Sequence, residues 1–196
     1  MEDNYLMHYG IKGMKWGIRR YQERGSSKRT KEGKKRYNEG ANRHPSPKAL
    51  SRSMRSIKYK DFTKLMSPDD VRRTRSGSCH DQVMYELLEL RKLGLNPKAT
   101  FVMEVDDNGQ GGMTHSFVHY KNGDKTSWFE NAWSERSGIK DYNSLSAIKN
   151  EIRKDHKSGA FGNRSRYKNL VFASFDERKH RPGESLQELV NKCFSK

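Results

Sequence analysis

Apolar residues first recur at regular intervals after the opening third of the chain. Val83, Leu87 and Leu90 lie four and three residues apart, which is the spacing of one face of a helix. Gly94 ends this run, and glycine commonly follows the last residue of a helix. The pattern therefore predicts a helix of roughly four turns, with Cys79 at its amino-terminal end.

Alternating and β-branched runs predict four strands downstream of this helix. An Asn-Gly-Asp segment at 122–124 is typical of a tight hairpin turn. A Ser-Pro-Asp-Asp segment at 67–70 predicts the start of a short helix that ends by Gly77. The predicted strands span residues 99–105, 115–121, 125–131 and 170–175, and two further helices span 144–154 and 185–194. Helices packed on an antiparallel sheet define an α+β fold.

The first 57 residues have a different character. Residues 21–57 hold few large aliphatic side chains and are rich in Ser, Gly, Lys and Arg. Such a segment buries too little apolar surface to offset chain entropy, so we expect a disordered linker. Residues 1–20 contain an apolar cluster that three glycines interrupt, which favours a docking peptide over a regular helix. The remaining residues, 58–196, form the predicted globular domain.

The net charge of +16 is concentrated in this amino-terminal arm. Residues 1–57 carry 15 Lys and Arg against 5 Asp and Glu, whereas residues 58–196 carry 25 against 19. A basic arm of this kind can bind nucleic acid nonspecifically, an anionic membrane surface or acidic proteins. It can equally be a solvated tail without a dedicated partner, and the charge alone does not decide between these roles.

Composition excludes several protein classes. No run of about 18 apolar residues occurs, so no membrane span is expected. The amino terminus lacks the apolar core of a secretory signal, so we do not expect the protein to be secreted by means of a signal peptide. Cys79 and Cys193 are the two cysteines, too few for a disulfide framework or a four-cysteine zinc site.

Three elements each offer a residue type that cysteine-dependent catalysis requires. Cys79 begins a helix, where the helix dipole is expected to lower the pKa of the thiol. His115 opens the second predicted strand as a candidate base, and Glu130 or Asn131 ends the third strand as the residue that orients it. Because neighbouring strand residues point to opposite faces, only one of these two faces His115. No cofactor or metal is expected, since His115 and His119 are separated by about 13 Å along one strand face, too far for one metal ion.

These residues stand in segments that resemble the transglutaminase-like superfamily. The segments SGSCHDQ, THSFVHY and WFENAW lie between residues 65 and 155 and resemble its phage and prophage branch. The resemblance implies a papain-like core in which a nucleophile helix packs on an antiparallel sheet, with Cys79, His115 and Glu130 as the triad. The superfamily's usual acid is Asp, so Glu130 is one methylene longer. Glu130 is favoured because Trp133 follows it at the superfamily's spacing.

Three residues in the same segments are candidates for oxyanion or supporting roles. They are Asp81, Gln82 and Trp128. Gln82 lies one turn into the predicted helix, where its side chain is poorly placed for an oxyanion hole unless that turn is distorted. The backbone N–H groups at and near Cys79 are therefore the expected oxyanion donors.

The basic arm contains a second recognisable segment. Residues 8–20, HYGIKGMKWGIRR, resemble a short motif in proteins of tailed phages and prophages of Gram-positive bacteria. The resemblance implies a phage structural protein as partner and a location in the host bacterial cytoplasm or the virion. The residues expected to dock are Tyr9, Lys12, Met14, Lys15, Trp16, Arg19 and Arg20.

Two functions follow from these interpretations. The first is a cysteine-dependent enzyme that cleaves amides in a protein or peptide substrate or transfers the acyl group to an amine, and the sequence leaves hydrolysis and crosslinking both open. The second is a catalytically inactive transglutaminase-like scaffold in a virion-associated or nucleic-acid-binding phage protein.

Overall fold

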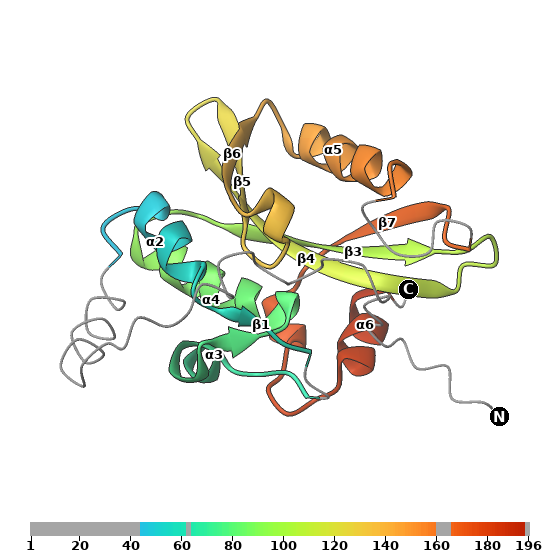
Figure 1. Ribbon diagram of the computed structural model, residues 1–196, viewed down its shortest axis with the longest axis horizontal. Helices are drawn as coiled ribbons and strands as arrows, with labels where there is room; N and C mark the ends of the chain where they lie inside the picture. The colour runs from blue at the N-terminus through green and yellow to red at the C-terminus, as the bar shows by residue number, and fades with distance from the viewer. Residues whose placement is uncertain (1–43, 62–63, 160–165, 195–196) are drawn as a thin grey trace.

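A five-stranded antiparallel sheet with helices on both faces forms the core of the protein (Figure 1). The computed structural model describes residues 44–61, 64–159 and 166–194. The docking motif expected in residues 1–20 and the greater part of the expected linker lie outside these residues. The described part is a mixed helix and sheet fold, which agrees with the α+β class predicted from the sequence.

The strands follow the order β6-β5-β4-β3-β7, and every neighbouring pair is antiparallel. Their bounds are Lys98–Val105 for β3, Gly111–Asn122 for β4, Lys125–Glu130 for β5, Gly138–Tyr142 for β6 and Asn169–Ser174 for β7. Strand β6 was not predicted. Strand β4 begins at Gly111 rather than at His115, because Gly111 and Thr114 already pair with β3. The hairpin between β4 and β5 turns at Gly123, which has a positive φ of 60°.

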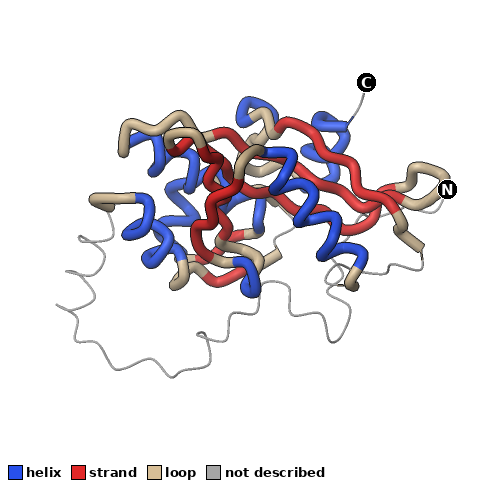
Figure 2. The backbone as a smooth tube through the Cα atoms, turned by 90° about the horizontal axis from the view of Figure 1, so that it is seen from above, coloured by secondary structure: helices blue, strands red, loops and turns tan. Residues whose placement is uncertain are grey.

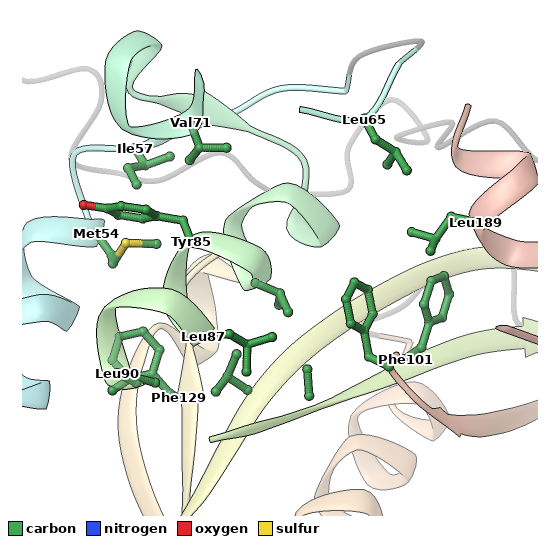
Figure 3. Packing of buried hydrophobic residues seen from close by; sticks show 14 of the residues in the cluster. Met54, Ile57, Leu65, Val71, Tyr85, Leu87, Leu90, Phe101, Phe129 and Leu189 are labelled. Atoms are coloured by element: carbon green, nitrogen blue, oxygen red, sulfur yellow. The ribbon is translucent and has the colours of Figure 1, made fainter. Parts of the chain in front are cut away.

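The predicted cysteine helix is α4, Cys79–Lys92. Ser78 caps it, with its side chain accepting the Asp81 N–H while the Asp81 side chain accepts the Ser78 N–H. This reciprocal arrangement satisfies two N–H groups at the helix start and fixes where the helix begins. Figure 3 shows Leu87 and Leu90 of α4 packed toward the sheet residues of the core.

Helix α5, Leu145–Lys157, covers the opposite face of the sheet. Its Ile148 and Ile152 pack with Phe117 and Trp128, which lie on the sheet face opposite to Val118. Figure 2 shows this helix lying across the strands when the molecule is viewed from above. The alternation of strand side chains thus builds two separate apolar cores, one on each face.

The prediction of a disordered linker over 21–57 is wrong for its last part. Residues Pro47–Met54 form α2, with Ser46 as its cap and Pro47 in its first turn. Leu50 and Met54 are completely buried in the core shared with α4. Their spacing of four residues is typical of a helix. The Ser and Arg residues around them, however, give the segment the composition of a polar linker.

A short connection leads from α2 to the start of α4. Strand β1, Lys58–Tyr59, pairs in parallel with β2, Ser76–Gly77. Between them lies α3, Pro68–Thr74, the predicted short helix capped by Ser67. Arg75 follows α3 with a left-handed backbone (φ 52°), so the chain turns there directly into β2.

The carboxy-terminal helix packs into the same hydrophobic core as α4. Helix α6, Leu186–Phe194, corresponds to the helix predicted at 185–194 and buries Leu189 and Val190 in the same core. Two single 3-10 turns, η1 at Ser134–Arg136 and η2 at Glu177–Lys179, connect the larger elements. Among the helices of the described ranges, none is long and apolar enough to cross a bilayer.

Candidate active site

Cys79 is the first residue of α4, and its thiol lies against the edge of β4. The Ser116 backbone N–H donates a hydrogen bond to this thiol. Strand β4 pairs with β5 only as far as Val118, opposite Phe129. Ser116 lies beyond this last pair, so its N–H is not part of the β4–β5 ladder. The thiol thus contacts the backbone of β4 at the residue that follows His115.

His115 and Glu130 form a buried hydrogen-bonded pair. Nε2 of His115 lies 2.8 Å from Oε2 of Glu130, and the two side chains are 0% and 2% exposed. The second carboxylate oxygen, Oε1, accepts the backbone N–H groups of Asn131 and Trp133, each at 2.9 Å. The Trp133 ring also meets the His115 ring edge to face, with centroids 6.1 Å apart. Three donors thus fix the position of the carboxylate.

This contact assigns the histidine tautomer. A carboxylate accepts hydrogen bonds, so Nε2 of His115 carries a proton. In the neutral imidazole Nδ1 is then the basic nitrogen, and a histidine held in this way can take a proton through Nδ1. Of the two residues that the sequence offered for orienting His115, Glu130 is therefore the one that contacts the ring.

Asn131 instead links the end of β5 to the start of α4. Its side-chain N–H₂ donates to Oε1 of Gln82. The side-chain N–H₂ of Gln82 in turn donates to the Gly77 carbonyl at 2.8 Å. Gln82 is thus engaged at both ends as a brace, and its N–H₂ group does not point to an oxyanion position beside Cys79.

Asp81 and Trp128 also have structural contacts. Besides capping α4, Asp81 accepts the Met66 N–H at 2.9 Å and lies 3.1 Å from Nε2 of His180. A carboxylate with these contacts anchors the amino-terminal end of α4 and donates nothing to an oxyanion. Trp128 is buried in the α5-side core against Trp133, where it supports the strand that carries Glu130.

A second histidine ties α4 to β4 beside the site. Nδ1 of His80 lies 2.7 Å from the Ser116 hydroxyl, and Nε2 lies 3.2 Å from the Thr114 hydroxyl. The ring also stacks on Phe101 at 4.6 Å between centroids. Because Thr114 and Ser116 flank His115, His80 fixes α4 against the part of β4 that carries His115.

The thiol pKa differs from the sequence prediction. Burial raises the pKa of the Cys79 thiol well above its usual value, and the negative charge of Asp61 raises it further. Glu130 and Asp81 act in the same direction, while the Ser116 N–H lowers the pKa. The helix dipole that the sequence invoked is outweighed, since a thiolate loses its hydration when it is buried.

Sequence reasoning missed one residue of the site, Tyr59. Its hydroxyl donates to Oδ1 of Asp61 at 2.7 Å and is also hydrogen-bonded to the Cys79 thiol. Tyr59 pairs with Gly77 in the parallel β1–β2 ribbon, two residues before the cysteine. A two-residue parallel pairing leaves no periodic signal, so only the assembled fold brings this phenol to the thiol.

Within the ranges that the structure describes, no three His, Cys, Asp or Glu side chains cluster so that they could hold a metal ion. His119, the other histidine considered with His115, contacts the Thr100 hydroxyl at 3.2 Å instead.

The comparisons with known proteins concern the amino terminus. The model of a family of unknown function, DUF7211, matches residues 1–23, which include the HYGIKGMKWGIRR segment. No curated protein matches the chain. The seven candidate docking residues all fall inside the matched segment, which lies outside the described residues.

Proposed function

We propose that the globular part of the chain is a cysteine-nucleophile enzyme of transglutaminase-like type, which cleaves or transfers acyl groups of amides. The observation that carries the proposal is the buried His115–Glu130 pair at 2.8 Å, beside a helix that begins with Cys79. A buried imidazole oriented by a carboxylate next to a thiol is the arrangement on which acyl transfer by cysteine depends.

In the proposed reaction His115 Nδ1 takes the thiol proton, and the Cys79 sulfur attacks the amide carbonyl carbon. The C–N bond then breaks, the imidazolium gives its proton to the leaving amine, and a thioester remains on Cys79. Water or an amine attacks the thioester, His115 accepts the proton of this nucleophile, and the C–S bond breaks. The proton returns to the sulfur, so the enzyme ends each cycle unchanged.

The first turn of α4 supplies the oxyanion donor in this proposal. Ser78 already uses two N–H groups of the turn, accepting Asp81 N–H through its hydroxyl and Gln82 N–H through its carbonyl. We assign the oxyanion role to the backbone N–H of Cys79, which lies next to the attacking sulfur. A backbone donor at a helix start is oriented before the negative charge develops.

The amino-terminal arm has a separate role in this proposal. The segment that matches a family model ends by residue 23, well before α2 begins at Pro47. We infer that the segment docks on a phage structural protein and delivers the enzyme to a protein or peptide substrate in the host bacterial cytoplasm or the virion. The basic residues between the two parts are suited to nonspecific contact with nucleic acid.

One observation favours the alternative of an inactive scaffold. The Cys79 side chain is 1% exposed, and its pKa is raised by burial. A thiol in that state neither meets a substrate nor attacks it until its surroundings change.

Trapping with a cysteine-directed acyl probe separates the two functions. We expect mass spectrometry to find the probe on Cys79 of the full chain, and to find none in Cys79→Ala or His115→Ala. Cys193→Ser is the matched control, because it removes the other thiol and lies outside the site. Equal labelling of wild type and His115→Ala would mean that the histidine is not the base, and the scaffold would then be the better description.

A further inference from the structure

A cavity of about 330 Å³ lies where the amino-terminal end of α5 meets the sheet. This volume is at the lower end of the range for small-molecule sites, roughly 300–1,000 Å³. None of the three candidate triad residues lines the cavity. The polar side chains that line it come from β3, β4, β5, their neighbouring loop and the start of α5, and they include Asn96, Lys98, His119, Lys121, Thr126 and Ser144.

The strand register places the basic side chains of the cavity on the α5 face of the sheet. Lys98 of β3 lies directly opposite His119 of β4, and His119 lies opposite Trp128 of β5. Residues that lie directly opposite each other share a sheet face, and Trp128 packs in the α5-side core. Lys121 follows His119 by two residues on β4 and therefore points to the same face. The cavity thus combines two exposed lysines with one buried histidine.

The positive charge at this cavity is not balanced by carboxylates. Within the described ranges, neither Lys98 nor Lys121 forms an ion pair, and no Asp or Glu lines the cavity. The first turn of α5 also has no acidic residue, although the helix dipole favours one there. Burial lowers the pKa of His119 to about 4, and the charges of Lys149 and Lys98 lower it further. The cavity is therefore an electrostatically favourable place for an anion.

The start of α5 supplies backbone donors at the cavity. The Ser144 hydroxyl accepts the Ala147 N–H at 3.2 Å, and the Ser144 carbonyl accepts the Ile148 N–H at 3.3 Å. Neither bond uses the N–H groups of Leu145 and Ser146, the first residues of the helix, and such groups commonly bind an acceptor from outside the helix. Leu145 itself lines the cavity.

His119 offers a ring nitrogen to the same space. The residue is 9% exposed and lines the cavity, and its Nε2 lies 3.2 Å from the Thr100 hydroxyl. Its Nδ1 has no hydrogen-bond partner among the described residues. When the Thr100 hydroxyl donates to Nε2, Nδ1 carries the ring proton and can donate it to an anion. A buried polar group without a partner is rare in proteins, and a bound ligand would satisfy this one.

We propose that this cavity binds a terminal phosphate group, either as the free ion or on a small molecule, with Lys98 and Lys121 balancing its charge and the start of α5 and His119 donating hydrogen bonds. A terminal phosphate carries nearly two negative charges and three acceptor oxygens, which suits two lysines and several donors around one hollow. The phosphates of a nucleic acid backbone instead carry one charge each along an extended line. The site shares no residue with the candidate triad, so the inference is independent of the proposed enzyme.

A titration of the full chain with inorganic phosphate, followed by NMR at pH 7 and constant ionic strength, tests the proposal. We expect the backbone amide resonances of Leu145 and Ser146 and the ring resonances of His119 to shift together and to saturate. Residue-specific signals separate this binding from any contact of phosphate with the basic amino-terminal arm. Shifts that are absent, or that rise without saturation, would overturn the proposal.

Single charge removals test whether the lysines of the cavity hold the ion. We expect Lys98→Gln and Lys121→Gln each to weaken phosphate binding by about tenfold, since each removes a charge-assisted contact. Lys154→Gln is the matched control, because it removes the same charge from an exposed lysine of α5 that does not line the cavity. This control should bind as the wild type does. Equal weakening in all three variants would mean that phosphate responds only to net charge, and would overturn the site.

Adenosine monophosphate and an oligonucleotide without a terminal phosphate identify the source of the group. Tighter binding of the monophosphate than of inorganic phosphate at these resonances would support a phosphorylated small molecule. Equal or weaker binding would support the free ion, and either result retains the phosphate site. If the oligonucleotide shifts the same resonances at lower concentration than both anions, the cavity is a contact for a nucleic acid backbone and the proposal is overturned.

Discussion

Glu130→Gln changes the charge of the orienting residue while nearly preserving its shape. The glutamine oxygen can still accept the N–H groups of Asn131 and Trp133, which lie 2.9 Å from Oε1 of Glu130. The glutamine N–H₂ group then faces Nε2 of His115, where the carboxylate oxygen lay at 2.8 Å. Two donors cannot face each other, so the imidazole must move its proton to Nδ1.

The tautomer change sets the size of the expected effect. Once Nδ1 carries the proton, it cannot accept the proton of the Cys79 thiol. We expect the rate of acyl-probe labelling to fall by about 10²- to 10⁴-fold, equivalent to roughly 3–5 kcal/mol in the barrier. The fold should survive, with a loss of about 1–2 kcal/mol in the free energy of unfolding, because one hydrogen bond to a charged group is replaced by a neutral contact.

The assay compares labelling rates and urea unfolding of the wild type, Glu130→Gln and Asn131→Ala. Asn131→Ala is the matched control, since it breaks the contact with Gln82 and leaves the carboxylate in place. We expect it to reduce the labelling rate less than Glu130→Gln does. The reasoning is refuted if Glu130→Gln labels at the wild-type rate, or if Asn131→Ala proves the more damaging change.

Two further predictions concern stability. Leu50→Ala should lower the free energy of unfolding by about 2–5 kcal/mol, because Leu50 is completely buried. Urea unfolding measures this loss, and a negligible loss would mean that α2 is not part of the core. Burial lowers the pKa of His119 to about 4, with Lys149 and Lys98 contributing. Since the unfolded chain binds this proton more readily, stability should fall as the pH drops from about 6.5 to 4, by up to about 3 kcal/mol. His119→Gln should flatten that part of the pH profile, and an unchanged profile would assign the acid sensitivity to other groups.

Local signals explain which parts of the fold the sequence could predict. The apolar spacing of Val83, Leu87 and Leu90, followed by Gly94, predicts α4 within a few residues of its observed bounds. The Asn-Gly-Asp turn similarly predicts the β4–β5 hairpin, which brings His115 and Glu130 together. These features depend on neighbours in the chain, so a single sequence contains the information.

Contacts between distant segments explain what the sequence did not show. Helix α2 has only Leu50, Met54 and Ile57 as apolar anchors near it, within a polar stretch that resembles a linker. Tyr59 reaches the thiol only through the pairing of β1 with β2. The thiol pKa was mispredicted for the same reason, because burial of Cys79 arises when α4 docks on β4 and not from the helix itself.

The separation of Cys79 from its partners along the chain has a consequence for the order in which the protein is made. His115 and Glu130 belong to one hairpin, only 15 residues apart, and can meet as soon as that hairpin closes. Cys79 leaves the ribosome well before Ser116, which supplies the N–H that holds its thiol. Until β4 has emerged, the sulfur has neither its partner in the sheet nor the histidine that we propose as its base. A nascent chain halted between these two residues therefore carries a thiol without the contacts of the proposed site, which form only after the hairpin has been translated.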